Sequence, residues 1–428
     1  MSKADAIFAL GTALLVFAAH AASPVVTSFD SRWTIATAAS IAHRGDTDLD
    51  EYEHLLHVDS YYGVERRGGH LYSRYPIGPA LVALPAVVVL DGLARVLHVP
   101  SSEDVIQRRA WGRVEVAVAS VIVAATSALV FLIARASGLR VAPALLVALV
   151  FGFCTPAWST ASRALWQHGP SMLMLAAALY LLLLARERPA WAVAAALPLA
   201  FALVVRPTNA VPLAAFTAYV GWRHPCQAIG YLALAAAVLA PFVCFNLALY
   251  GEPFSPYYHP SGQPVASGWS AAAVAALGHL VSPNRGLLVF SPVLVAAAAG
   301  AVAELRRRRF DALDLAVAAS IVGHLVLISL AGQWWAGHSF GPRFFTDVLP
   351  LLTYFLGFAV AALDEMSCAA RLRLALLFAA LCAWSFYAHY RAATDWDVWA
   401  WNAEPVDVDE RPERVWDWTD LQILRGAR

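Results

Sequence analysis

Isolated arginines stand where long apolar runs of this sequence begin or break. Arg285 and Arg343 each lie in a short segment rich in glycine, proline and aromatic residues, and Arg206 separates two apolar runs. A guanidinium can donate two parallel N–H bonds to one phosphate, and the free backbone N–H groups of a helix start add to that attraction. An unpaired charge between apolar runs is costly. These arginines therefore predict sites for an anionic group such as a phosphate.

A second group of polar residues follows the first apolar run. Asp30 comes directly after that run, with Arg32 two positions later, and Arg74 and Tyr75 end the polar loop 27–75. A lone carboxylate in such a loop can act as a general base. It can equally be a solvated carboxylate paired with Arg32, and Arg74 can either bind an anion or extend towards lipid head groups. Both alternatives stay open from the sequence.

The same loop holds an acidic run. Residues 46–51 contain four carboxylates in six positions, enough oxygens to hold a hard cation, although such runs are more often solvated turns. The histidines of the loop lack the i, i+4 spacing of a zinc-binding helix. We therefore predict no metal-ligating residues, and a divalent cation stays an alternative as a cofactor.

The composition is typical of a membrane protein. The 428 residues are 60% hydrophobic and 14% charged, and the mean hydropathy is +0.60. A soluble domain carries about a quarter charged residues, so the chain lacks the polar side chains for a water-facing surface. The formal net charge is zero, which argues against a nucleic-acid partner, since such partners need a basic face. The five cysteines have no paired spacing and predict neither disulfides nor a metal site.

The apolar runs predict an all-α, polytopic transmembrane helix bundle of about eleven spans. The first run, 7–26, is expected to be a retained helix rather than a cleaved signal peptide. Arg306 to Arg309 mark a cytoplasmic loop, because such loops hold an excess of basic residues. With that orientation the basic loops agree if 76–98 is an interfacial helix that does not cross, and we predict such a helix. The alternative is that 76–98 spans the membrane and a later pair of short runs counts as one span. We predict a transmembrane domain over 1–390, with a large first outer loop at 27–109 that contains interfacial helices, and an outward-facing tail at 391–428.

Four short features occur in a familiar order. Asp30 follows the first span, YPIGP stands at 75–79, VRPTN at 205–209 and GPRFF at 341–345. This order resembles the GT-C-type polytopic glycosyltransferases, which use polyprenyl-phosphate sugars and include protein O-mannosyltransferases and aminoarabinose transferases. In that class an acidic residue of the first outer loop is catalytic, and the resemblance gives this role to Asp30. The sequence departs from the class at Ser31, where a second acidic residue is usual. It also departs at 166–168, where many members carry an acidic residue and this chain has Trp166, Gln167 and His168. This second departure argues against a metal-dependent mechanism.

Together these features predict an inverting glycosyltransferase of the bacterial inner membrane. Transfer needs a base for the acceptor hydroxyl and cations for the departing phosphate. Asp30 is the expected base. The expected donor-phosphate ligands are Arg74, Arg285, Arg343, Arg206 and His338, and the expected substrate-binding residues are Arg32, Tyr75, Trp166 and His168. The expected partners are a polyprenyl-phosphate sugar, a glycan, lipid or protein acceptor, and membrane lipids. The alternatives are a lipid or solute transporter, which would bury its charges within the membrane, and a non-catalytic scaffold of the cell envelope.

Overall fold

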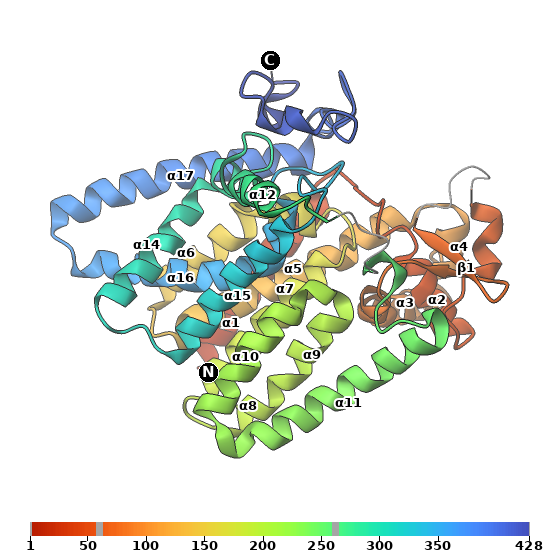
Figure 1. Cartoon of the computed structure of the whole chain (residues 1–428), viewed down its shortest axis with the longest axis horizontal. Helices are drawn as coiled ribbons and strands as arrows, with labels where there is room; N and C mark the ends of the chain where they lie inside the picture. The colour runs from red at the N-terminus through yellow and green to blue at the C-terminus, as the bar shows by residue number, and fades with distance from the viewer. Residues whose placement is uncertain (1, 57–62, 259–264, 428) are drawn as a thin grey trace.

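The chain folds almost entirely into helices, as the sequence predicts (Figure 1). The computed structural model describes residues 2–56, 63–258 and 265–427, and helix accounts for 72% of the chain. Within these described ranges, seven helical segments are long and apolar enough to cross a membrane: Lys3–Ala22, Gly78–Leu97, Trp111–Ala136, Pro225–Tyr250, Ala312–Ser329, Arg343–Glu365 and Cys368–Thr394. They indicate a membrane protein.

Further apolar helices are shorter than a typical span. They are Val141–Phe153, His168–Leu184, Ala190–Val205 and Trp269–Val281. The predicted number of about eleven spans therefore stays a prediction. The segment predicted to be interfacial, 76–98, contains one of the seven long apolar helices, so its position at the membrane surface is also still a prediction.

The helices are bounded as follows. In chain order they are α1 (Lys3–Ala22), α2 (Thr34–His43), α3 (Gly78–Leu97), α4 (Ser102–Gln107), α5 (Trp111–Ala136), α6 (Val141–Phe153), α7 (His168–Leu184), α8 (Ala190–Ala194), α9 (Ala196–Val205), α10 (Ala210–Arg223), α11 (Pro225–Tyr250), α12 (Trp269–Val281), α13 (Leu287–Phe290), α14 (Val295–Arg306), α15 (Ala312–Ser329), α16 (Leu349–Ala362), α17 (Cys368–Thr394) and α18 (Asp397–Ala400). The short helical turns that matter below are η2 (Ala157–Ala161), η4 (Pro256–Tyr258), η5 (Pro292–Leu294) and η6 (Arg343–Val348).

Local sequence explains several helix ends. Ser2 with Asp5 forms a capping box at the start of α1, and Asp311 with Asp314 forms one at α15, so the first free N–H groups are satisfied. Gly251 ends α11 in the left-handed conformation, which glycine adopts without steric cost. The chain thus sets the boundaries of these helices before packing contributes.

The central helix of the bundle is α5, which packs against α1, α6 and α7. Other helices keep large apolar side chains at the surface, among them Ile7 and Leu10 on α1 and Leu372 and Leu376 on α17. Such exposure is unfavourable in water and suits a hydrocarbon environment. The burial pattern therefore agrees with a bundle embedded in lipid.

The predicted first outer loop forms a compact subdomain at one end of the bundle (Figure 1). It contains α2, α3, α4 and an antiparallel hairpin of β1 (Val64–Arg67) and β2 (His70–Ser73), packed around a core that they share with Ala119 and Ile122 of α5 and with Leu165. The hairpin turn uses Gly68 and Gly69, both at positive φ, where glycine is favoured. The sequence predicted the helical part of this loop but not the hairpin.

The segment 158–166 is buried. Its π-helical turn η2 lies inside the bundle, and Trp158 and Trp166 are both almost fully covered. Arg163 is fully buried and donates to the backbone carbonyl groups of residues 20, 23, 25 and 158. These bonds replace the water that a charged side chain would otherwise need, which explains how the segment enters the interior.

The described part of the tail, 391–427, lies on the same side of the bundle as α12 (Figure 1). Asn284 donates to the carbonyl groups of Arg414, Asp417 and Asp420, and Ser282 donates to that of Val415 at 2.6 Å. The described part of the tail is therefore fixed against the loop that follows α12.

Candidate functional site

Two adjoining hollows meet where several predicted site residues converge. The inner cleft has about 410 Å³ of empty space and is lined by Asp30, Tyr75, Trp166, His168, Arg206 and Arg343, together with Tyr257 and Tyr258. The outer cavity, about 1420 Å³ including its open mouth, shares Asp30, Trp166 and Arg343 with the cleft and adds Arg32 and His338. Eight of the ten residues predicted from the sequence line one hollow or the other.

Asp30 and Arg343 form an ion pair at the junction of the two hollows. Arg343 Nη2 donates to the Asp30 carboxylate, and both side chains are largely buried. The guanidinium also lies 4.0 Å from the ring centroid of Trp166, within cation–π distance. Three segments far apart in the chain therefore meet here: the turn after α1, the buried segment before α7, and η6.

A second carboxylate, Asp347, anchors the inner wall of the cleft. It is fully buried and forms an ion pair with Arg206 Nη1 at 3.0 Å, and His168 Nδ1 lies 3.2 Å from it. His324 Nε2 lies 3.9 Å away. Arg343 Nε donates to His168 Nε2 at 3.2 Å. The sequence analysis did not identify Asp347.

Arg206 presents an unused donor to this cleft. It ends α9 in extended backbone and is only 6% exposed. Its Nε atom has no hydrogen-bond partner among the described residues, although Nη1 bonds to Asp347 and His168. A buried N–H without a partner is costly. The cleft therefore offers an anion a donor that the protein itself leaves unsatisfied.

Glu115 of α5 fixes the turn that carries Asp30 through hydrogen bonds. This carboxylate is fully buried and accepts from Ser28 Oγ at 2.5 Å, from Ser31 Oγ and from the backbone N–H of Leu165 at 3.1 Å. It joins the Asp30 turn to the residue that precedes Trp166. Glu115 was also missed from the sequence, because a single acidic residue inside an apolar run does not reveal its partners.

Two tyrosines of η4 cover the cleft. Tyr258 donates its hydroxyl to Gln167 Oε1 at 2.6 Å, and the Tyr257 ring lies 4.6 Å from that of Tyr75. Burial raises the pKa of both Tyr257 and Tyr258 above the ordinary range, so both hydroxyls stay protonated at neutral pH. These hydroxyls and rings can contact a sugar by hydrogen bonding and stacking.

Two predicted phosphate ligands lie elsewhere. Arg285 is buried and donates to the backbone carbonyls of Trp335, Gly337 and Asn284 and to the side chains of Gln422 and Asn402. Its guanidinium thus holds the tail in place and lines neither hollow. The Arg74 side chain lies 3.8 Å from Glu65, is partly exposed and lines neither hollow, and the backbone carbonyl of Arg74 accepts from Tyr257 N at 3.2 Å.

His338 lies at the rim of the outer cavity. Its Nε2 atom contacts both Asp407 oxygens, at 2.9 and 3.0 Å, and Asp409 lines the cavity beside it. The tail therefore supplies part of the outer cavity wall. His338, Asp407 and Asp409 could together hold a cation, since their ligand atoms lie within 4.8 Å of one another.

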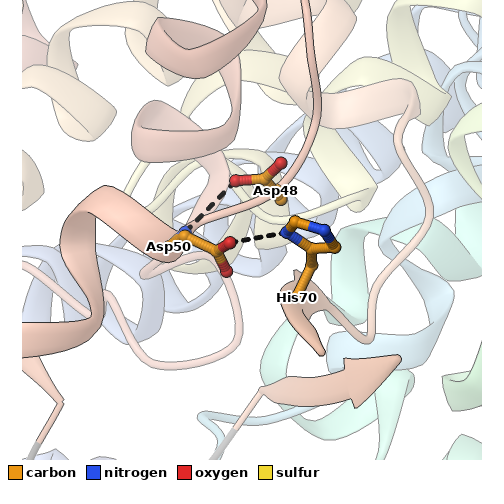
Figure 2. Close-up of side chains that lie close together, drawn as sticks. All are labelled: Asp48, Asp50 and His70. Carbon is orange, nitrogen blue, oxygen red and sulfur yellow. Dashed lines mark hydrogen bonds and ion pairs between the residues drawn. The ribbon is translucent and has the colours of Figure 1, made fainter. Parts of the chain in front are cut away.

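The acidic run of the first loop is used within the hairpin region. Figure 2 shows Asp50 accepting from His70 Nδ1 at 2.6 Å, with Asp48 accepting from the backbone N–H of Asp50. Asp50 also accepts from Leu71 N at 2.8 Å. These bonds favour the interpretation of a structured turn. Asp48, Asp50 and His70 are nevertheless close enough to share a cation.

Comparison with known proteins assigns the chain to no family. No protein-family model matches it. No curated protein shows significant similarity to it. The functional argument therefore depends on the site itself and on the resemblance of the short motifs.

Proposed function

We propose that this protein is a membrane glycosyltransferase that moves a sugar from a polyprenyl-phosphate donor to an acceptor hydroxyl with inversion. The observation that carries the proposal is the convergence of Asp30, Arg206 and Arg343 on one cleft from distant parts of the chain. A base and two cations at one position are what this transfer requires.

Arg343 and Arg206 form the phosphate-binding part of the cleft in this proposal. Arg206 brings its unused Nε donor, and Arg343 can exchange its bond to Asp30 for a bond to the phosphate. Arg206 is buried and the Arg343 side chain is largely buried, so their attraction to a phosphate is weakly screened. Because Arg285 holds the tail and Arg74 faces Glu65, neither is part of the proposed cradle.

Asp30 acts as the base once the donor has bound. Movement of Arg343 towards the phosphate releases the carboxylate, which then takes the proton of the acceptor hydroxyl. The acceptor oxygen attacks the anomeric carbon, the carbon–oxygen bond to phosphate breaks, and the polyprenyl phosphate leaves as an anion. Direct displacement by one nucleophile inverts the anomeric carbon without a covalent enzyme intermediate.

The two hollows divide the substrates. The donor phosphate occupies the inner cleft with His168, Tyr75 and Trp166 around the sugar. The acceptor, a glycan, lipid or protein, enters through the outer cavity past Arg32 and His338. We propose that this side faces outward from the bacterial inner membrane, because the arginine-rich loop 306–309 belongs on the cytoplasmic side.

A transporter is the second candidate, and one observation favours it. Arg206, Asp347 and His168 form a fully or nearly buried charged cluster between helices, as in many transport pathways. A transporter would move its substrate unchanged, so the two candidates differ in whether the sugar–phosphate bond is broken.

The test is to incubate purified protein in lipid with radiolabelled polyprenyl-phosphate sugars and an acceptor extract. We expect loss of label from the lipid with the wild type, and at least a hundredfold slower loss with Asp30→Asn, the lower end for removal of a general base. Glu53→Gln is the matched control, because it removes an exposed carboxylate from the same loop whose ion pair with Arg66 contributes little.

Equal cleavage by the wild type and Asp30→Asn would reject Asp30 as the base. Intact donor with every sugar tested would reject the transferase. If the same protein then carried the labelled lipid across a vesicle membrane, the transporter would replace it.

A further inference from the structure

An apolar crevice opens between α14, α16 and the first half of α17. It contains about 790 Å³ of empty space, and every residue that lines it has an apolar side chain. Alanines of α14, including Ala299 and Ala303, form a low floor, and Leu374, Leu377 and Phe378 of α17 form one wall. The crevice shares no lining residue with the cleft or with the outer cavity.

The helix arrangement explains why this space exists. α14 and α16 pack closely, since a Cβ atom at Gly300 would lie 2.1 Å from the carbonyl oxygen of Phe355. α17 is held through its second half, where His389 contacts Ser159 and Ser291, each at 2.7 Å. The first half of α17 carries exposed leucines and diverges from α14 and α16 (Figure 1).

Basic residues collect at the end of the crevice where α14 finishes and α17 begins. The segments 304–309 and 363–373 together contain six arginines and three acidic residues. The acidic residues are already used: Glu365 and Glu304 contact Arg307, at 2.8 and 3.8 Å, and Asp364 contacts Arg140 at 2.6 Å. The remaining arginines with no acidic partner among the described residues are Arg306, Arg308, Arg371 and Arg373.

Two of these arginines continue the walls of the crevice. Arg306 lies one helical turn beyond Ala303, and Arg371 lies one turn before Leu374. Residues three apart share a helix face. Helix periodicity therefore places Arg306 and Arg371 on the crevice-lining faces of α14 and α17, just beyond the residues that line the apolar space.

We propose that this crevice binds one anionic phospholipid, with an acyl chain between α14, α16 and α17 and the phosphate at Arg306 and Arg371. The combination suits such a lipid, because the hydrocarbon covers the apolar floor and the head group neutralises the unpaired guanidiniums. A zwitterionic lipid supplies the same chain but no net charge. The proposal is independent of the proposed enzyme activity.

The test is native mass spectrometry of delipidated full-length protein titrated separately with phosphatidylglycerol and phosphatidylcholine of equal chain length. We expect the wild type to retain one phosphatidylglycerol in preference to phosphatidylcholine. The variant Arg306→Gln/Arg371→Gln should bind phosphatidylglycerol about 30-fold more weakly, since each arginine near an anionic head group contributes about a fivefold factor. Its matched control is Arg188→Gln/Arg223→Gln, which removes two arginines from other helix ends and should bind as the wild type does.

A second variant tests the apolar part without changing charge. Ala299→Phe/Ala303→Phe fills the floor of the crevice and should reduce retention of both lipids, with Arg306 and Arg371 intact. Size-exclusion profiles and circular dichroism establish that each variant is folded. Equal retention of the two lipids by the wild type would overturn the proposal, as would a preference that both variants preserve.

Discussion

Removing Asp347 should destabilise the protein more than removing any exposed carboxylate. Asp347 is fully buried and its Oδ2 lies 3.0 Å from Arg206 Nη1, so Asp347→Asn leaves a guanidinium in the interior without its counter-charge. Two unit charges about 4 Å apart attract by about 4 kcal/mol at an effective dielectric constant near 20, and breaking a buried pair typically costs about 3–5 kcal/mol.

The assay is thermal unfolding in lipid nanodiscs with a double-mutant cycle. At about 2.1 cal/mol/K per residue, a loss of about 4 kcal/mol corresponds to a fall in Tm of about 4 °C for a chain of this size. Arg206→Met strands the carboxylate and should cost a similar amount. Asp347→Asn/Arg206→Met removes both charges and should cost clearly less than the two single changes added together.

The reasoning would be refuted by additive effects. If the double variant lost the sum of the two single losses, Asp347 and Arg206 would not stabilise each other, and the buried cluster would need another explanation. Glu187→Gln, an exposed carboxylate at the end of α7, is the control and should leave Tm within about 1 °C, since surface changes are usually within ±0.5 kcal/mol.

Three further predictions concern the supports of the site. Glu115→Ala should lower the free energy of unfolding by about 1–3 kcal/mol for each buried donor left unsatisfied, measured by the same unfolding assay; an unchanged Tm would show that water replaces the carboxylate. Arg285→Met should make the tail 391–428 susceptible to limited proteolysis while the bundle stays resistant. A digestion pattern equal to that of Arg188→Met would show that Arg285 does not hold the tail in place. The hydrogen bond from His338 lowers the pKa of Asp407, so the ionised carboxylate stabilises the folded tail above its unfolded-state pKa of about 3.9, and this contribution is lost as pH falls through the lower folded-state pKa. Proteolysis of the tail should therefore increase at low pH, and His338→Gln should remove the part of the pH dependence that this pair causes.

The sequence was sufficient for the helical class and for much of the site. Apolar run length predicted the helices, and the pattern of isolated polar residues at run ends selected Asp30, Arg206 and Arg343, which the structure brings together. It could not tell an arginine that faces a cavity from one that binds carbonyl groups. Arg285 has the same glycine- and proline-rich surroundings as Arg343, yet its guanidinium is used by the carbonyl of Asn284, by the loop after α15 and by the tail.

The residues missed from the sequence are those whose partners are distant. Glu115 lies in an apolar run, and its three donors come from residues 28, 31 and 165. Asp347 contacts Arg206 and His168, which belong to other helices. The β-hairpin had a local signal, because Gly68 and Gly69 separate two short polar strands, but neither strand has the alternating apolar pattern that usually identifies one.

The hydrogen bonds that Asn284 and Arg285 make to the tail also determine when the outer cavity can form. A ribosome releases residue 285 long before residues 402–422, so Arg285 leaves the tunnel without the side chains of Asn402 and Gln422 that later surround it. Until the tail arrives, the cavity lacks Asp409, and a buried guanidinium lacks two of its acceptors. The part of the outer cavity wall that contains Asp409 is therefore completed only after the tail has been synthesised. A nascent chain with its helices already in place still has an incomplete site.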